Sequence, residues 1–246
     1  MNKQKPAAVT WALSVLLCAC AGTPVSDTPL PVTLGSGFTL PSLFDEPESD
    51  RNPAHALHWL DQRWYAEAEV MAGSQRQAMV LDSCTDYLAA PEPVHPARSQ
   101  EMAAFSELAV NCIAAGLIAA GKASRQSYIE RRLVDENLPQ RMPSMLALMT
   151  SDSEWTRVDP GQTWDQVNTN SSFTATGENA GRFAHGGAIQ ELAEMARGDF
   201  TKDGLEDVLL SSFDHVQGGS YTARRLFLLS RESLEQPFKV TQLYPR

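Results

Sequence analysis

Hydrophobic residues recur at steps of three and four through residues 54–150, the spacing that places them on one face of a helix. This pattern predicts four helices, over about 56–71, 74–90, 99–120 and 125–137. The third is apolar almost all round, which indicates burial between its neighbours. Glu107 and Asn111 near its middle argue against a membrane span.

The pattern changes from residue 155, where prolines, glycines and β-branched residues replace the alanine-rich spacing. Strands and turns are predicted, the strands over 207–213, 221–230 and 238–244 and the turns at 168–172 and 185–187. Residues 189–197 fit a helix by composition and a strand by position. Leu226–Leu229 is apolar on both faces, which predicts a central strand covered by helices. The expected fold class is α+β, a helical bundle over 54–150 followed by an antiparallel β-sheet over 151–246.

The first 19 residues have the order of a secretory signal peptide. Lys3 and Lys5 give a basic start, an apolar run covers 11–17, and small residues follow. The run is far shorter than the roughly 20 residues needed to span a bilayer. We therefore expect residues 1–19 to be removed on export.

Leu17-Cys18-Ala19-Cys20 resembles the lipobox of bacterial lipoproteins. The resemblance implies cleavage before Cys20, whose acyl chains then anchor the protein in a lipid membrane. No aspartate follows Cys20, and by analogy with enteric lipoproteins Ala21 favours the outer membrane, with the protein facing the periplasm. The alternative is an ordinary secretory signal with two incidental cysteines.

Residues 20–53 are rich in proline, glycine and serine and show no hydrophobic periodicity. Such composition is typical of a flexible spacer, here one that lifts the domain from the membrane. The alternative is a loop packed on the domain through four large hydrophobic residues, Phe38, Leu40, Leu43 and Phe44.

The chain is acidic, with a formal net charge of −10 that becomes −12 when Lys3 and Lys5 leave with the signal peptide. This charge argues against nucleic acid as a partner, because phosphate backbones repel an acidic surface. It fits a basic protein partner, and it also fits a surface that is simply solvated.

Cys84 and Cys112 are the two cysteines that remain after processing at Cys20. One pair in an oxidising compartment most simply forms one disulfide, which would staple two of the predicted helices. A loop of this size should contribute about 3–4 kcal/mol to stability. Two buried free thiols are the alternative. Zinc is disfavoured because no second cysteine or histidine lies at ligand spacing from either residue.

An acidic loop runs from Asp199 to Asp207, with oxygen-bearing side chains at every second position up to Asp203. It resembles the calcium loop of FG-GAP repeats, in which a strand enters and a strand leaves. The resemblance implies calcium ligands in five residues: Asp199, Thr201, Asp203, Leu205 through its carbonyl, and Asp207. The loop occurs once, so a full propeller is not expected. An acidic β-turn without metal is the alternative.

Catalytic motifs are missing from the sequence, which has no Gly-x-Ser-x-Gly elbow, His-Glu-x-x-His pair or phosphate-binding glycine loop. His185 beside Gly186-Gly187, and Asp214-His215 beside a turn, are the candidates that remain for an envelope hydrolase.

Two functions therefore stay open. The first is a non-catalytic protein-binding module, for which immunity proteins that neutralise periplasmic toxins are an analogy from localisation and charge. The second is an envelope hydrolase with a site near His185 or His215.

Overall fold

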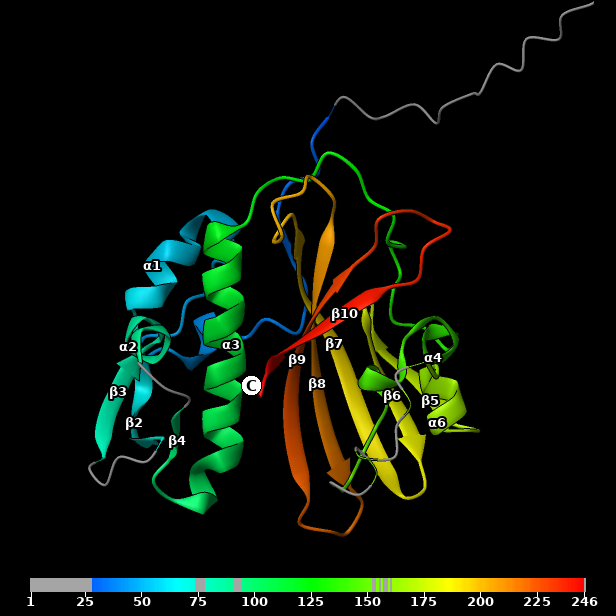
Figure 1. The fold of residues 1–246 in the computed structure, drawn as a ribbon. Helices are drawn as coiled ribbons and strands as arrows, with labels where there is room; N and C mark the ends of the chain where they lie inside the picture. Colours follow the sequence, from blue (N-terminus) through cyan, green and yellow to red (C-terminus); the bar gives the residue numbers. More distant parts are fainter. Residues whose placement is uncertain are drawn as a thin grey trace, which may run out of the picture.

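The computed structural model describes residues 28–245, except for 74–77, 91–93, 152, 153, 155, 157, 158 and 160. The signal peptide, Cys20 and the start of the expected spacer lie outside the described residues. In Figure 1 a long helix, α3, stands between a small β-sheet with two short helices and a large, twisted β-sheet. The protein is thus a mixed helix-and-sheet fold.

The large sheet is antiparallel, with the strand order β10-β9-β8-β7-β6-β5. Its strands are β5 (Ser172–Gly177), β6 (Ala180–His185), β7 (Ala188–Gly198), β8 (Asp207–Val216), β9 (Thr222–Ser230) and β10 (Lys239–Tyr244). A two-residue strand, β1 (Thr33–Leu34), pairs with the end of β7. The strands expected over 207–213, 221–230 and 238–244 are confirmed as β8, β9 and β10, and residues 189–197 belong to a strand, β7.

Both turns predicted in this half are confirmed. Gly186 and Gly187 have φ angles of 59° and 83°, and a two-residue hairpin turn of type I′ needs positive φ at both positions, which glycine adopts at no steric cost. The turn before β5 contains Asn170 at φ 61°, a conformation that asparagine tolerates better than most residues.

The expected helical bundle is wrong in its first half. The helices α1 (Ala56–Asp61) and α2 (Cys84–Ala89) are short, and a three-stranded sheet lies beside them, made of β2 (Arg63–Ala72), β3 (Met79–Ser83) and β4 (Val94–Pro96). The even-numbered positions from Trp64 to Ala72 are all apolar, and all of them except the exposed Ala66 are buried or partly buried. Residues that recur at every second position also include pairs four apart, which fit one face of a helix. The pattern is therefore compatible with both structures, and this segment forms a strand.

The helix expected over 125–137 is also wrong. The chain from 121 to 137 is irregular, because its backbone groups bond to distant segments: Lys122 pairs with Asp199, Ser124 with Leu30, and the Arg125 N–H donates to the Gly204 carbonyl. A short helix, α4 (Leu138–Arg141), follows.

The third predicted helix is confirmed as α3 (Met102–Ala120), which is long and apolar enough to cross a membrane but is mostly buried inside the protein. It packs on one face of the large sheet, and its other side meets α1, α2 and the small sheet. The opposite face of the large sheet is covered by α4, α6 (Trp164–Val167) and the segment between them, which form a second core. Four 3-10 helices complete the described elements: η1 (Leu40–Leu43), η2 (Pro53–His55), η3 (Ser99–Glu101) and η4 (Ser144–Leu146).

The described part of the expected spacer is folded onto the domain. Phe38, Leu40 and Phe44 are at most 1% exposed and belong to the core around α3. The ring of Phe38 lies 5.5 Å from that of Trp59 in α1. The packed-loop alternative therefore holds for these residues, because their side chains bury more apolar surface than a solvated spacer could.

The Cys84–Cys112 disulfide is confirmed and joins the start of α2 to the middle of α3. Both sulfur-bearing residues are fully buried. The bridge thus fixes the small sheet and its helices to the long central helix.

Candidate functional site

The acidic loop connects β7 to β8, as the sequence predicts, and turns its backbone amides onto its own carboxylates. The Asp199 carboxylate accepts hydrogen bonds from the N–H groups of Lys202, Asp203 and Gly204, at 2.6, 3.1 and 2.9 Å. Lys202 and Gly204 have φ angles of 68° and 89°, which tighten the loop around this acid. Asp199 is 4% exposed and is held by the loop itself.

Asp207 closes the loop from the first residue of β8. Its Oδ2 accepts from the N–H groups of Phe200 and Thr201, both at 2.9 Å. Its Oδ1 is buried and makes no hydrogen bond with the described residues. The Ser230 side chain lies near the carboxylate and acts to lower its pKa. Burial raises the pKa of Asp207, and these hydrogen bonds oppose the rise only in part.

The arrangement does not gather the acids around one point. No three Asp, Glu, His or Cys side chains among the described residues are placed to hold a metal ion together. The Asp203 carboxylate accepts from the Leu205 N–H at 2.8 Å, in a local turn, and faces a separate cavity of about 300 Å³ shared with the β9–β10 connection. Within the loop, Asp207 Oδ1 is a buried carboxylate oxygen without a hydrogen bond among the described residues, so calcium rests on the residue spacing and on this oxygen.

A buried ion cluster supports the base of the loop. Arg197 bonds to Glu194 at 2.9 Å and to Glu206 at 3.3 Å, and Glu206 accepts from the Ser127 hydroxyl at 2.6 Å. All three charged residues are at most 8% exposed. Burial raises the pKa of Glu194, and Arg197 opposes this rise. The cluster ties the irregular segment near Ser127 to the strands that carry the loop.

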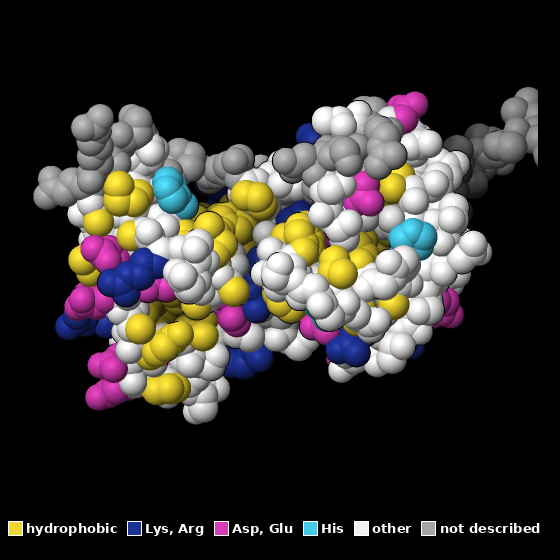
Figure 2. Space-filling model, turned by 90° about the horizontal axis from the view of Figure 1, so that it is seen from below, with side chains coloured by type: hydrophobic (Ala, Val, Ile, Leu, Met, Phe, Trp, Pro, Cys, Tyr) yellow, Lys and Arg dark blue, Asp and Glu magenta, His cyan; other side chains and the backbone are white. Residues whose placement is uncertain are grey.

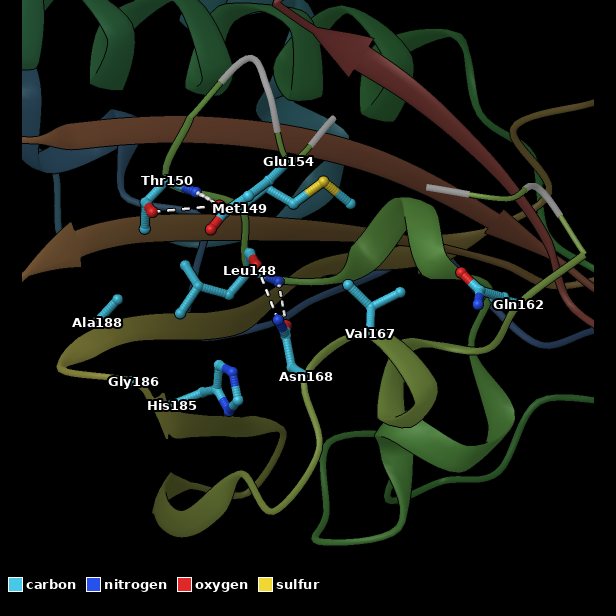
Figure 3. A pocket seen from close by; sticks show the side chains of 10 residues that line it. All are labelled: Leu148, Met149, Thr150, Glu154, Gln162, Val167, Asn168, His185, Gly186 and Ala188. Atoms are coloured by element: carbon cyan, nitrogen blue, oxygen red, sulfur yellow. Dashed lines mark hydrogen bonds between the residues drawn. The ribbon is translucent and has the colours of Figure 1, made fainter. Parts of the chain in front are cut away.

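A cavity of about 400 Å³ lies on the other side of the large sheet from α3. Figure 3 shows the ten residues that line it: Leu148, Met149, Thr150, Glu154, Gln162, Val167, Asn168, His185, Gly186 and Ala188. They come from the η4–α6 segment, from the end of α6 and the residue after it, and from the hairpin that joins β6 to β7. Sequence reasoning singled out His185 here and missed the other polar groups.

Asn168 holds one wall of this cavity. Its side-chain oxygen accepts from the Leu148 N–H at 2.7 Å and from the Trp164 indole N–H at 3.0 Å. Its side-chain amide donates to the Leu148 carbonyl at 3.0 Å. Asn168 is 6% exposed, so all of these bonds lie in a dry environment, where an unmade hydrogen bond is costly.

Arg225 and Gln190 hold the same wall from the sheet. The Arg225 guanidinium donates to the carbonyls of Met145 and Ala147 at 3.2 and 3.0 Å, and Gln190 donates to the Leu146 carbonyl at 3.0 Å. The charge of Arg225 is balanced by Asp214, 2.7 Å away. Four polar side chains, counting Asn168 and the Tyr221 hydroxyl on Met149, thus fix one irregular stretch of backbone.

Glu154 stands at another wall of the cavity. Its Oε2 accepts from the Thr150 N–H at 2.6 Å and from the Thr150 hydroxyl at 3.2 Å. In Figure 3 Glu154 and Thr150 lie on one side of Leu148, and His185 lies on the other. The histidine and the acid share the cavity but do not point toward each other.

The Asp214–His215 pair is not formed. Neighbouring residues of a strand point to opposite faces of a sheet, so Asp214 meets Arg225 on one face while His215 lies on the other. The His215 ring stacks on Phe213 with centroids 5.4 Å apart. His215 therefore lies away from the cavity that contains His185.

A notch separates the lower half of α3 from the large sheet. We define it by six residues, Met102, Ser106, Glu107, Phe213, Arg224 and Tyr244, which line two cavities of about 200 and 220 Å³. The Arg224–Glu107 ion pair, at 3.1 Å, crosses between them, and the Arg224 guanidinium lies 4.7 Å from the centre of the Phe213 ring. Figure 2, seen from below, shows hydrophobic side chains gathered on both sides of a hollow, with basic side chains near it.

Comparison of the chain with protein-family models, curated proteins and solved structures gave no match. No relative therefore assigns a role to the acidic loop, the cavity or the notch.

Proposed function

We propose that this protein is a lipid-anchored, non-catalytic protein-binding module of the bacterial cell envelope that faces the periplasm. The signal-like N-terminus and the lipobox-like Leu17–Cys20 support the location. The Cys84–Cys112 disulfide fits an oxidising compartment. The outer membrane is the proposed site of the anchor.

The observation that carries the proposal is the composition of the notch. Aromatic residues, methionine and arginine are enriched in the cores of protein interfaces. The notch presents Phe213, Tyr244, Met102 and Arg224 together, and Met102 is 45% exposed. A partly open cleft between a helix and a sheet, lined by these residue types, suits an inserted loop or chain segment of a partner.

The charge of the chain suggests the kind of partner. At a net charge of −12 after removal of the signal peptide, the protein would attract a basic protein and speed its association. An inhibitor or immunity protein that blocks a toxin in the periplasm has this combination of location, charge and missing catalytic motifs.

Site-specific photo-cross-linking in cells tests the notch. A photoreactive amino acid at Met102 should give one dominant cross-linked partner, because this side chain lines the cleft. The matched control is Leu234, another exposed hydrophobic residue at 63%, which lies in the β9–β10 connection away from the notch. Equal cross-linking from both positions, or none from Met102, would remove the support for this surface.

Calcium at the acidic loop is a second part of the proposal, in a structural role. It is supported by the spacing of Asp199, Asp203 and Asp207, by the positive φ of Gly204 and by the spare capacity of Asp207 Oδ1. Carboxylates that accept amide hydrogen bonds have further lone pairs for a cation. Bound there, the ion would draw these acids together and stiffen the connection from β7 to β8.

An envelope hydrolase is the second candidate, and one observation favours it. The 400 Å³ cavity contains both a histidine, His185, and an acid, Glu154, with the Thr150 hydroxyl bonded to the acid. Hydrolysis of chromogenic ester or peptide substrates that is lost in His185→Ala, with unchanged folding, would establish this function in place of binding alone.

A further inference from the structure

The cavity beside His185 has the size and the fixed walls of a ligand-binding site. Its volume of about 400 Å³ falls in the range of about 300–1,000 Å³ that is usual for ligand pockets. Its wall at 145–149 is fixed by buried side chains, among them Asn168 and Arg225. A site held in this way loses little conformational freedom when something binds, which favours affinity.

The charged residues around the cavity favour a ligand of opposite charge. Its ten described lining residues include a carboxylate, Glu154, and no Lys or Arg. Arg225 stands behind the wall, but its charge is matched by Asp214 at 2.7 Å. Among the described residues around the cavity, the unmatched charge is therefore negative.

Hydrogen bonds orient the Glu154 carboxylate through one of its two oxygens. Both donors from Thr150 bond to Oε2, so Oε1 is left without a hydrogen bond among the described residues. An oriented carboxylate with one open oxygen is an acceptor for an ammonium or guanidinium group, in a charge-assisted hydrogen bond.

The apolar part of the lining fits the rest of such a ligand. Leu148, Met149 and Val167 present hydrocarbon surface between the Glu154 wall and the His185 wall. Lysine and arginine carry a cationic head on a flexible aliphatic stem, and the stem prefers such surface. His185 and Gln162 supply polar groups for the backbone of the residue that carries the stem.

We propose that this cavity binds a lysine or arginine side chain of the partner protein, with the cationic head on Glu154 and the aliphatic stem against Leu148, Met149 and Val167. The inference rests on the proposed binding function and adds to the notch a second, charge-selective contact. The acidic net charge of the chain favours a partner that presents such side chains.

A titration followed by NMR tests the cavity without any partner. The probe is Nα-acetyl-lysine methylamide, and the matched control is Nα-acetyl-norleucine methylamide, which keeps the stem and lacks the charge. The lysine probe should shift the methyl signals of Leu148 and Val167 in a saturable way at millimolar concentration, while the control should shift them little. No saturable shift up to roughly 10 mM, a concentration that would populate even a very weak site, overturns the inference.

Two variants distinguish specific recognition of the charge from non-specific binding of the probe. Glu154→Gln keeps an oxygen for the Thr150 amide and removes the charge, so binding of the lysine probe should fall by about tenfold or more, as expected for loss of a charge-assisted bond. Glu178→Gln removes an acid that is 79% exposed in the β5–β6 turn, and it should leave binding unchanged. Equal losses in both variants would contradict a site at Glu154.

Failure of the cavity proposal and failure of the protein-binding function give different results. If the partner cross-links at Met102 and binds Glu154→Gln as tightly as the native protein, the cavity proposal is wrong and the binding function stands. If the lysine probe binds at Glu154 but no protein partner is captured, the cavity recognises a cationic group while the binding function fails.

Discussion

Two ion pairs across the large sheet, the shortest there among the described residues, should differ greatly in their effect on stability. Arg225–Asp214 and Arg182–Glu191 both have their closest nitrogen and oxygen 2.7 Å apart. The side chains of the first pair are 4% and 1% exposed, and those of the second are 48% and 40% exposed. The two pairs therefore have the same nitrogen–oxygen distance and differ in the burial of their side chains.

At 2.7 Å the direct attraction is about 6 kcal/mol with the effective dielectric constant of about 20 that describes protein sites, and about 1.5 kcal/mol in water. Asp214→Asn keeps the shape and leaves the Arg225 charge buried. The three carbonyl groups around the Arg225 guanidinium offset part of the cost of burying its unpaired charge. We therefore expect a loss of about 3–5 kcal/mol in the free energy of unfolding. Glu191→Gln should cost about 0–1 kcal/mol, because solvent screens the exposed pair.

Urea denaturation followed by far-UV circular dichroism, with the disulfide intact, measures both values. Arg225 also holds the cavity wall, so Asp214→Asn should broaden or shift the NMR signals of Ala147 as well. Equal losses for the two variants, or a loss below about 1 kcal/mol for Asp214→Asn, would refute the assignment of Asp214 as the charge that balances Arg225.

Replacing Cys84 and Cys112 together by alanine should lower the free energy of unfolding by about 3–4 kcal/mol, as chemical denaturation would show; a change under about 1 kcal/mol would contradict the entropic reasoning, given the sequence separation of 28. Calcium at a hundredfold excess over its dissociation constant should stabilise the protein by about 2.7 kcal/mol, and Asp203→Ala should abolish this effect; melting curves of metal-free native protein that coincide with calcium and with chelator would mean that the loop is only an acidic turn. Without calcium, burial raises the pKa of Asp207, so the folded state binds this proton more readily than the unfolded state. Stability should therefore fall as the pH rises from about 4 through the raised pKa, and Asp207→Asn should lose that share of the pH dependence in urea midpoints. Cys20→Ser should leave an unlipidated precursor, and undiminished incorporation of labelled fatty acid would exclude Cys20 as the anchor.

The sheet strands were predictable because their pattern is local. β8, β9 and β10 show runs of apolar and β-branched residues bounded by turn residues, and each lies close to its expected place. The helix α3 was predictable for a similar reason, since its apolar residues leave no alternative to a buried helix.

The region before α3 could not be settled by periodicity. In β2 the inward residues Trp64, Ala68 and Ala72 are four apart, which fits one face of a helix as well as one face of a strand. The segment 125–137 failed for a different reason. Its composition permits a helix, but the backbone of Lys122, Ser124 and Arg125 bonds to segments that are distant in the sequence. Tertiary contacts override local propensity there.

The candidate sites show the same division. The acidic loop was found because its residues are consecutive, but the amide hydrogen bonds that occupy Asp199 were not visible in the spacing. Asn168 and Arg225 were missed because the backbone groups they hold lie 20 and 78 residues away. A charged residue beside the apolar run Leu226–Leu229 is the one signal that could have drawn attention to Arg225.

Affinity capture from detergent-solubilised envelope tests the central claim, that this protein binds another protein through the notch. The native protein should recover one stoichiometric partner, and Leu234→Glu should recover the same amount, because this exposed residue lies outside the notch. Met102→Glu places a charge in the apolar cleft and should reduce recovery at least about tenfold while the melting temperature stays unchanged. Recovery of no stoichiometric partner by the native protein, or undiminished recovery by Met102→Glu, would contradict the account.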